Sequence, residues 1–171
     1  MRIVLMGYMA SGKSTVGRLL ASDLQLDFVD LDDYIEEQQK KSIKTIFSEK
    51  GEIFFRKLEH QMLSQVLDTR NNMVLSTGGG TPCYSGNMET ILEKSDDSVY
   101  LQLSIPALVE RLQKEKEQRP LVRNIEDADL PEFVGKHLFE RRAYYARAKH
   151  IVECEGKNLE EVVAEIKKML L

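Results

Sequence analysis

A glycine-rich loop near the amino terminus has the residues and the spacing that bind a nucleoside triphosphate. Residues 7–14 read GYMASGKS and match the pattern G-x-x-x-x-G-K-[ST]. The glycines allow backbone N–H groups to turn inward around phosphate oxygens. Lys13 is expected to reach the β- and γ-phosphates, and the Ser14 hydroxyl is expected to ligate Mg²⁺. The positions of the loop expected to contact ATP are Ala10, Ser11, Gly12, Lys13, Ser14 and Thr15.

Two carboxylates separated by one residue could supply the acceptor side of a transfer reaction. Asp30-Leu31-Asp32 follows the apolar pair Phe28-Val29, and alternate side chains of an extended segment share a face. Both carboxylates are therefore expected to point toward the carboxyl edge of a parallel sheet, where ligands bind. One could hold the metal or its water shell, and the other could accept the proton of an attacking hydroxyl. The alternative is a solvated acidic turn that caps the next helix, a part that we assign to Asp33.

Three consecutive glycines follow the apolar run Met73-Val74-Leu75. Gly78, Gly79 and Gly80 would expose backbone N–H groups and would let a ligand approach the chain closely. A flexible turn would have the same composition. The triplet is therefore a candidate binding element. The residues that lie beside it in the fold decide between ligand binding and a flexible turn.

Several arginines could bind or stabilise an anion, although each also has an ordinary surface interpretation. Arg56 follows Phe54-Phe55 in an amphipathic helical pattern. Arg119 lies in a highly charged segment that reads as a loop, and an arginine on a loop that closes over a transferring phosphate can stabilise developing charge. Arg141 and Arg142 lie in a later helical pattern, where a solvated helix face is the default interpretation.

The elements that must position these residues are short apolar runs alternating with longer helical patterns. Helices are expected over 12–24, over about 31–68 with breaks near Ser42 and Gly51, around Leu108, over 130–147, and after a capping Asn158. The expected strands are 3–6, 28–29, 73–75, 99–103 and 151–152. Such alternation favours an α/β fold with a parallel sheet covered by helices on both faces. The phosphate loop then has the strand before it and the helix after it that its motif requires.

Length and charge restrict the function classes. The chain has 171 residues, which fits one domain with its own hydrophobic core, and its net charge is −4, which disfavours nucleic-acid binding. The amino-terminal apolar run is too short for a signal peptide, and no stretch approaches the roughly 20 apolar residues that span a bilayer. The two cysteines have no metal-ligand spacing and read as reduced thiols. With no coiled-coil seam, we expect a cytoplasmic monomer that does not bind membranes.

Taken together, these motifs resemble the shikimate kinase family over almost the whole chain. The order and spacing of the motifs carry the resemblance, since none of the later ones is decisive alone. The motifs are the loop 7–14, Asp30-Leu31-Asp32, Phe55-Arg56, Gly78-Gly79-Gly80, Arg119-Pro120-Leu121, and Arg141 followed by Tyr144-Tyr145. The resemblance implies phosphorylation of shikimate by ATP to shikimate 3-phosphate, on the route to chorismate and the aromatic amino acids.

The resemblance also implies roles on the nucleotide side. Lys13 would handle the phosphates as a catalytic residue, and Ser14 would bind Mg²⁺. Asp30 would support the same Mg²⁺ ion through water. Arg119 would swing in on a lid as a second catalytic cation, and Arg111 looks like the adenine-side arginine of the family.

On the acceptor side, the resemblance implies that Asp32 holds the shikimate hydroxyls and acts as the catalytic base toward the one that is phosphorylated. Arg56 and Arg141 would pair with the shikimate carboxylate. Arg142 is a second candidate for the place of Arg141, because Ala143 stands where the family often has a proline. The backbone donors would come from Gly78, Gly79 and Gly80.

The fold that the resemblance implies is a three-layer α/β/α sandwich of the P-loop kinase type with a five-stranded parallel sheet. A helical shikimate-binding region would cover about residues 31–62, and a mobile lid would cover about residues 113–129. The chain has Ala10 where many members have glycine. The segment after Val152 matches the adenine loop of the family poorly, so the sequence assigns no contact there.

Two enzyme classes and one class without enzyme activity compete with this interpretation. Gluconate kinase has a similar phosphate loop and acceptor class, but it does not require the aspartate pair, the glycine triplet and the carboxylate-binding arginines in this order. A nucleoside monophosphate kinase is disfavoured on the same grounds. A P-loop binding or regulatory module would bind ATP without acceptor-dependent release of ADP. The combination of Lys13, Ser14, Asp32 and Arg119 favours an enzyme.

Overall fold

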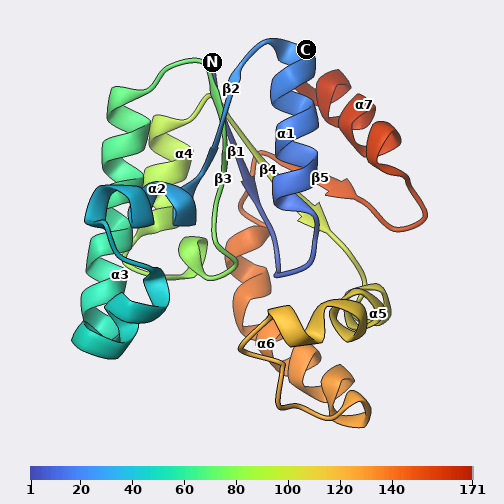
Figure 1. Ribbon diagram of the computed structural model, residues 1–171. Helices are drawn as coiled ribbons and strands as arrows, with labels where there is room; N and C mark the ends of the chain where they lie inside the picture. The colour runs from blue at the N-terminus through green and yellow to red at the C-terminus, as the bar shows by residue number, and fades with distance from the viewer. Residues whose placement is uncertain (171) are drawn as a thin grey trace.

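Residues 1–170 are described by the computed structural model of the chain, and five strands in that range form one parallel sheet (Figure 1). The spatial order of the strands is β2-β3-β1-β4-β5, and every neighbouring pair is parallel. The bounds are β1 Arg2–Met6, β2 Asp27–Asp30, β3 Met73–Ser76, β4 Asp97–Gln102 and β5 His150–Glu153. Each strand was predicted from its apolar run, with ends that differ by one or two residues.

Helices cover both faces of this sheet, which gives the predicted three layers. Figure 1 shows α1 (Lys13–Leu24) and α7 (Leu159–Leu170) on one side, and α3 (Ile43–Thr69) with α4 (Asn87–Lys94) on the other. All four residues of β3 are buried, as expected for a strand covered twice. No element was predicted at α4, because its eight residues carry only a short apolar pattern built on Met88 and Ile91.

The helical region after β2 is divided where the sequence predicted breaks. α2 (Leu31–Gln39) ends before Ser42, whose hydroxyl accepts from the backbone N–H of Thr45 at 3.1 Å and caps α3. Within α3, Gly51 has φ 85° and ψ 174°, a conformation that a residue with a Cβ rarely adopts. The kink at this glycine separates the first turns of α3 from the part that carries Arg56.

Two further helices lie at the carboxyl edge of the sheet and pack against each other: α5 (Ile105–Glu115) and α6 (Leu130–Tyr145). The charged segment between them was predicted as a loop from residue 113, but helical structure extends through a short 3-10 helix, Lys116–Gln118. Val122 is fully buried and anchors the rest of the segment, which also contains the 3-10 helix Asp127–Asp129. Mobility of this segment stays a prediction.

The closing helix begins at the predicted cap. Asn158 Oδ1 accepts from the backbone N–H of Glu161 at 2.8 Å, and Glu161 Oε1 accepts from the backbone N–H of Asn158 at 3.1 Å. This reciprocal capping box fixes the turn between β5 and α7, which faces the large cavity described below. None of the helices within residues 1–170 has both the length and the apolar character needed to cross a membrane.

Candidate active site

One cavity of about 670 Å³ lies at the carboxyl ends of the central strands, beside the strand β1 where the direction of winding changes. Ligands of open parallel sheets bind at such switch points. Its lining includes the predicted residues Ala10, Ser11, Gly12, Lys13, Ser14, Thr15, Asp30, Asp32, Gly78, Gly79, Arg111 and Arg119. Gly80, Arg56 and Arg141 do not line this cavity but adjoin it at the glycine triplet.

The phosphate loop between β1 and α1 is closed by its own lysine. Lys13 Nζ donates to the carbonyl oxygens of Gly7 at 2.7 Å and Tyr8 at 3.1 Å. Burial, helped by the neighbouring positive charge of Arg119, lowers the pKa of Lys13 to about 8. Ala10 has φ 67°, a left-handed conformation that favours glycine, which is the residue that the resemblance leads one to expect there.

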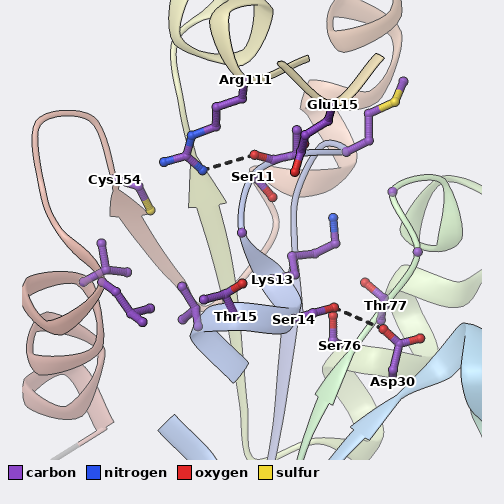
Figure 2. A pocket seen from close by; sticks show the side chains of 18 of the residues that line it. Ser11, Lys13, Ser14, Thr15, Asp30, Ser76, Thr77, Arg111, Glu115 and Cys154 are labelled. Atoms are coloured by element: carbon purple, nitrogen blue, oxygen red, sulfur yellow. Dashed lines mark hydrogen bonds between the residues drawn. The ribbon is translucent and has the colours of Figure 1, made fainter. Parts of the chain in front are cut away.

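Two hydroxyls of the loop are placed for ligands. Ser11 Oγ is buried and has no hydrogen-bond partner among residues 1–170, a situation that is unfavourable unless a ligand supplies one. Ser14 Oγ donates to Asp30 Oδ2 at 3.2 Å, and Figure 2 shows this pair on one side of Lys13. The loop therefore offers the cavity an unpaired hydroxyl, a buried ammonium group and a hydroxyl–carboxylate pair.

Both aspartates line the cavity, but the secondary structure that carries them differs from the predicted extended segment. Asp30 ends β2, but α2 begins at Leu31, so Asp32 lies in a helical turn rather than in an extended segment. The cap of α2 is Asp30, whose Oδ1 accepts from the backbone N–H of Asp33 at 3.1 Å. The assignment of the cap to Asp33 was therefore wrong, because a side chain caps the N–H three residues after it. The expectation that both carboxylates meet the cavity is confirmed.

Asp32 has the most perturbed carboxyl group at the site. Burial, helped by the negative charges of Asp30 and Glu59, raises the pKa of Asp32 to about 7. A carboxyl group poised near neutral pH can exchange a proton with a substrate hydroxyl. Asp32 thus offers the cavity a carboxyl group that changes its protonation state near neutral pH.

The glycine triplet is the point where the predicted acceptor residues converge. A Cβ atom built on Gly80 would lie 3.2 Å from guanidinium nitrogens of both Arg56 and Arg141. A Cβ atom on Gly78 would lie 3.4 Å from Asp32 Oδ1. The missing side chains therefore let two cations and a carboxylate share one stretch of backbone. The close approach of a ligand to these glycines stays a prediction.

A buried carboxylate that sequence reasoning missed holds Arg56. Glu59 is 2% exposed, and its Oε1 accepts from Arg56 Nη1 at 3.0 Å. Its Oε2 accepts from the Thr81 hydroxyl at 2.8 Å, so Glu59 joins the helix α3 to the segment after the triplet. The spacing of three residues on one helix was the available signal, but only the fold shows that Glu59 faces inward.

The structure distinguishes between the two candidate arginines of α6. Arg141 faces the triplet, whereas Arg142 is exposed and lies 5.9 Å over the ring of Phe139. Arg141 also continues the buried stripe of Leu138 and Tyr145 at spacings of three and four residues, a signal that the sequence did contain. The hydroxyl of Tyr145 donates to the carbonyl of Gly79, which ties this face of α6 to the triplet.

The far end of the cavity is built around Arg111, whose Nη1 donates to the carbonyl oxygen of Ala10 at 3.1 Å. Figure 2 shows Arg111 and Cys154 across the loop from Asp30. Arg119 also lines the cavity, with its Nε 3.3 Å from Glu115 Oε2. The residues of the β5–α7 turn and of α7 that complete this end were not predicted from the sequence: Cys154, Lys157, Asn158, Leu159 and Val162.

Comparisons with known proteins point to one family. The family model described as Shikimate kinase matches residues 9–171. A shikimate kinase of Flavobacterium psychrophilum is 45% identical over 170 residues, which cover 99% of this chain and 98% of the relative. The crystal structure of shikimate kinase from Bacteroides thetaiotaomicron superimposes with a TM-score of 0.92 at 38% identity, covering 99% of this chain and 98% of the other. A structure of the Acinetobacter baumannii enzyme in complex with shikimate gives 0.87 at 30% identity, with coverage of 99% and 92%.

Proposed function

The chain belongs to the shikimate kinase family, and we propose that it transfers the γ-phosphoryl group of ATP to a hydroxyl of shikimate, forming shikimate 3-phosphate. The observation that carries this proposal is the meeting of Asp32, Arg56 and Arg141 at the glycine triplet, directly beside the phosphate loop. In this proposal, the phosphate loop that binds ATP and the site for an anionic polyol lie at the same edge of the sheet.

The acceptor site matches the chemistry of shikimate group by group. A guanidinium binds a carboxylate through paired hydrogen bonds, and both Arg56 and Arg141 present nitrogens at Gly80. Asp32, at Gly78, would accept hydrogen bonds from the ring hydroxyls. With the carboxylate bound at one end of the triplet, a hydroxyl at the other end would lie between Asp32 and the phosphate loop.

The transfer itself would depend on positioning and on positive charge. Asp32 would take the proton of the attacking hydroxyl, since its raised pKa makes it a competent acceptor near pH 7. Lys13 would leave the carbonyls of Gly7 and Tyr8 for the phosphates. Arg119 would approach the same phosphates from the segment after α5 and stabilise charge that develops on them. Arg111 would lie toward the nucleoside.

A divalent metal fits one place in this arrangement. Ser14 Oγ and Asp30 Oδ2 lie 3.2 Å apart on the cavity wall, and paired oxygen donors of this kind suit Mg²⁺, which retains water and phosphate ligands. We propose that Ser14 holds Mg²⁺ directly and that Asp30 supports it through water. When bound, the ion would neutralise charge on the transferring phosphate.

The proposed partners are ATP and shikimate, with no nucleic acid or membrane involved. We propose that the enzyme works as a monomer, because the sequence contains no obvious coiled-coil seam. We also propose a cytoplasmic location, where ATP is available and where Cys83 and Cys154 remain reduced.

An acceptor panel tests the proposed function. ADP release would be measured with a coupled assay in the presence of shikimate, gluconate, a nucleoside monophosphate, or no acceptor. Among these acceptors, we expect only shikimate to stimulate ADP release strongly. Stimulation by gluconate instead would identify the rival enzyme class, and ATP binding with no acceptor-dependent release would indicate a regulatory module.

Replacing Arg119 by alanine is expected to lower kcat by roughly 10²-fold or more, because a cation that stabilises the transferring phosphate contributes on that scale. KM for shikimate should change little, since Arg119 acts on the phosphates in this proposal and its charge already influences the pKa of Lys13 in the phosphate loop. Steady-state kinetics with each substrate varied in turn measure both quantities. A change confined to KM for shikimate would contradict the phosphate role.

The pH dependence of kcat/KM should follow the shifted pKa values of Asp32 and Lys13. Protonation of Asp32 below a pKa of about 7 removes the base, so kcat/KM should fall about tenfold per pH unit on the acid side. Loss of the Lys13 charge above a pKa of about 8 should produce a descending alkaline limb. The rate would be measured with both substrates limiting and the concentration of fully ionised MgATP held constant. A flat profile between pH 5.5 and 7 would contradict the assignment of Asp32.

A further inference from the structure

We propose that Tyr84 is a positioning residue for the guanidinium of Arg56, and that its aromatic ring, and not its hydroxyl, fixes the plane of that group. Tyr84 directly follows the short 3-10 helix Thr81–Cys83 that comes after the glycine triplet. The inference rests on the proposed function, in which Arg56 binds the carboxylate of shikimate. It adds a residue to the acceptor site that neither the sequence motifs nor the cavity lining indicated.

The first observation is the close stacking of the two side chains. The Cζ atom of Arg56 lies 3.9 Å from the centroid of the Tyr84 ring. The other arginine–aromatic pairs found in residues 1–170 are separated by 5.0–5.9 Å. A separation of 3.9 Å is van der Waals contact, at which both dispersion and the attraction of a cation to the ring face are strongest.

The second observation is that hydrogen bonds restrain Arg56 incompletely. Arg56 Nη1 donates to Glu59 at 3.0 Å, but the buried Nε has no hydrogen-bond partner within the described residues. The nearest carboxylate to Nε is that of Glu52, which is 3.8 Å away on an exposed side chain. One hydrogen bond fixes one corner of a planar group and leaves its tilt free. The ring of Tyr84 supplies the missing restraint on the plane.

The third observation is that Tyr84 and Glu59 are anchored to the same short segment. Thr81, which donates to Glu59, offers its carbonyl to Asn87 Nδ2 at 2.9 Å. The backbone N–H of Asn87 in turn donates to the carbonyl of Tyr84 at 2.9 Å. The segment from Gly80 to Asn87 therefore anchors both groups that contact the guanidinium of Arg56: the carboxylate of Glu59 at its edge and the ring of Tyr84 on its face. The guanidinium is oriented toward Gly80 before any ligand arrives.

The ring, and not the hydroxyl, is assigned this role because the hydroxyl of Tyr84 makes no hydrogen bond to residues 1–170. Tyr84 is 36% exposed, so its removal opens no cavity in the core. A substitution that keeps the ring should therefore keep function, and one that keeps only the bulk should not. This difference separates a role in orienting Arg56 from a general structural role.

The test compares three variants by steady-state kinetics. Tyr84→Leu is expected to raise KM for shikimate roughly 5- to 25-fold, with kcat and KM for ATP within about twofold of wild type. Tyr84→Phe should restore wild-type KM. Phe139→Leu is the matched control, since it removes an exposed arginine–aromatic contact on α6 away from the site, and it should change neither KM.

Two further measurements make the result decisive. Phenylalanine analogues with increasing fluorination at position 84 weaken the negative face of the ring at nearly constant shape, so KM for shikimate should rise stepwise along the series. In an Arg56→Leu background, Tyr84→Leu should have no further effect. An unchanged KM in Tyr84→Leu, or an equal loss in Tyr84→Phe, would overturn the role of the ring. If Arg56→Leu itself left KM for shikimate unchanged, the proposed carboxylate site would fail instead.

Discussion

Replacing Asp32 by asparagine is expected to lower kcat with shikimate by roughly 10²- to 10⁴-fold, the range that a positioned general base contributes. Asparagine preserves the shape of the side chain but cannot accept the proton of the attacking hydroxyl. The affinity for ATP should stay near the wild-type value, because the loop residues that face the phosphates are untouched. Rapid-quench or coupled assays of turnover, together with a direct titration of ATP, measure the two effects separately.

The same variant should be more stable than wild type at alkaline pH. Burial raises the pKa of Asp32 to about 7 in the folded protein, so ionising this group costs more there than in the unfolded chain. The stability that its protonated form contributes is therefore complete below about pH 4 and is lost as the pH rises through about 7. Asparagine cannot ionise, so the Tm of Asp32→Asn should exceed that of wild type at pH 8.

The stability comparison serves as the control for folding. The difference in Tm between Asp32→Asn and wild type should disappear below about pH 3, where the carboxyl group is protonated in both the folded and the unfolded protein. A variant that lost turnover and also lost stability at pH 8 would indicate a misfolded site. Turnover that survived within a few-fold would exclude Asp32 as the base.

Replacing Arg56 by leucine is expected to raise Kd for shikimate by roughly 30-fold or more, the effect of truncating one partner of a buried, hydrogen-bonded charge pair. The Kd for ATP should be unchanged, because Arg56 lies outside the phosphate loop and does not line the cavity beside it. Isothermal titration with each substrate measures both values. Equal weakening of the two substrates would point to a folding defect instead of a lost carboxylate contact.

A matched variant is needed because Glu59 depends on Arg56. Arg56→Leu leaves the buried carboxylate of Glu59 without its cation, which itself destabilises a folded protein by about 3–5 kcal/mol. Arg56→Lys retains a positive charge for Glu59 but loses the planar, two-pronged contact. It should fold normally and still bind shikimate more weakly than wild type. Normal shikimate binding by both variants would contradict the carboxylate role.

Local patterns were sufficient to predict the phosphate loop, the strands and the breaks in the helical region. Each of these depends on neighbours in the sequence, as the cap at Ser42 and the positive φ of Gly51 illustrate. The aspartate pair was placed correctly for an incorrect reason. An N-cap and the first helical turn can direct two carboxylates to one cavity as well as an extended segment can, and the sequence did not distinguish between them.

Contacts made only by tertiary packing could not be predicted. Glu59 meets Thr81 across 22 positions, and Tyr84 meets Arg56 across 28, so neither contact has a local signal. The turn that carries Lys157 enters the cavity because β5 closes the sheet beside β4. In each case, the residue type indicated which interactions the side chain could make, and the topology of the fold determined which residues it contacts.

The most direct test of the central claim is a crystal structure of the protein with shikimate and MgADP. The carboxylate of shikimate is predicted to lie between the guanidinium groups of Arg56 and Arg141 at Gly80, with a ring hydroxyl within hydrogen-bond distance of Asp32 and facing Lys13. Shikimate bound elsewhere, or bound with its carboxylate away from both arginines, would contradict the proposed acceptor site while leaving the nucleotide site intact.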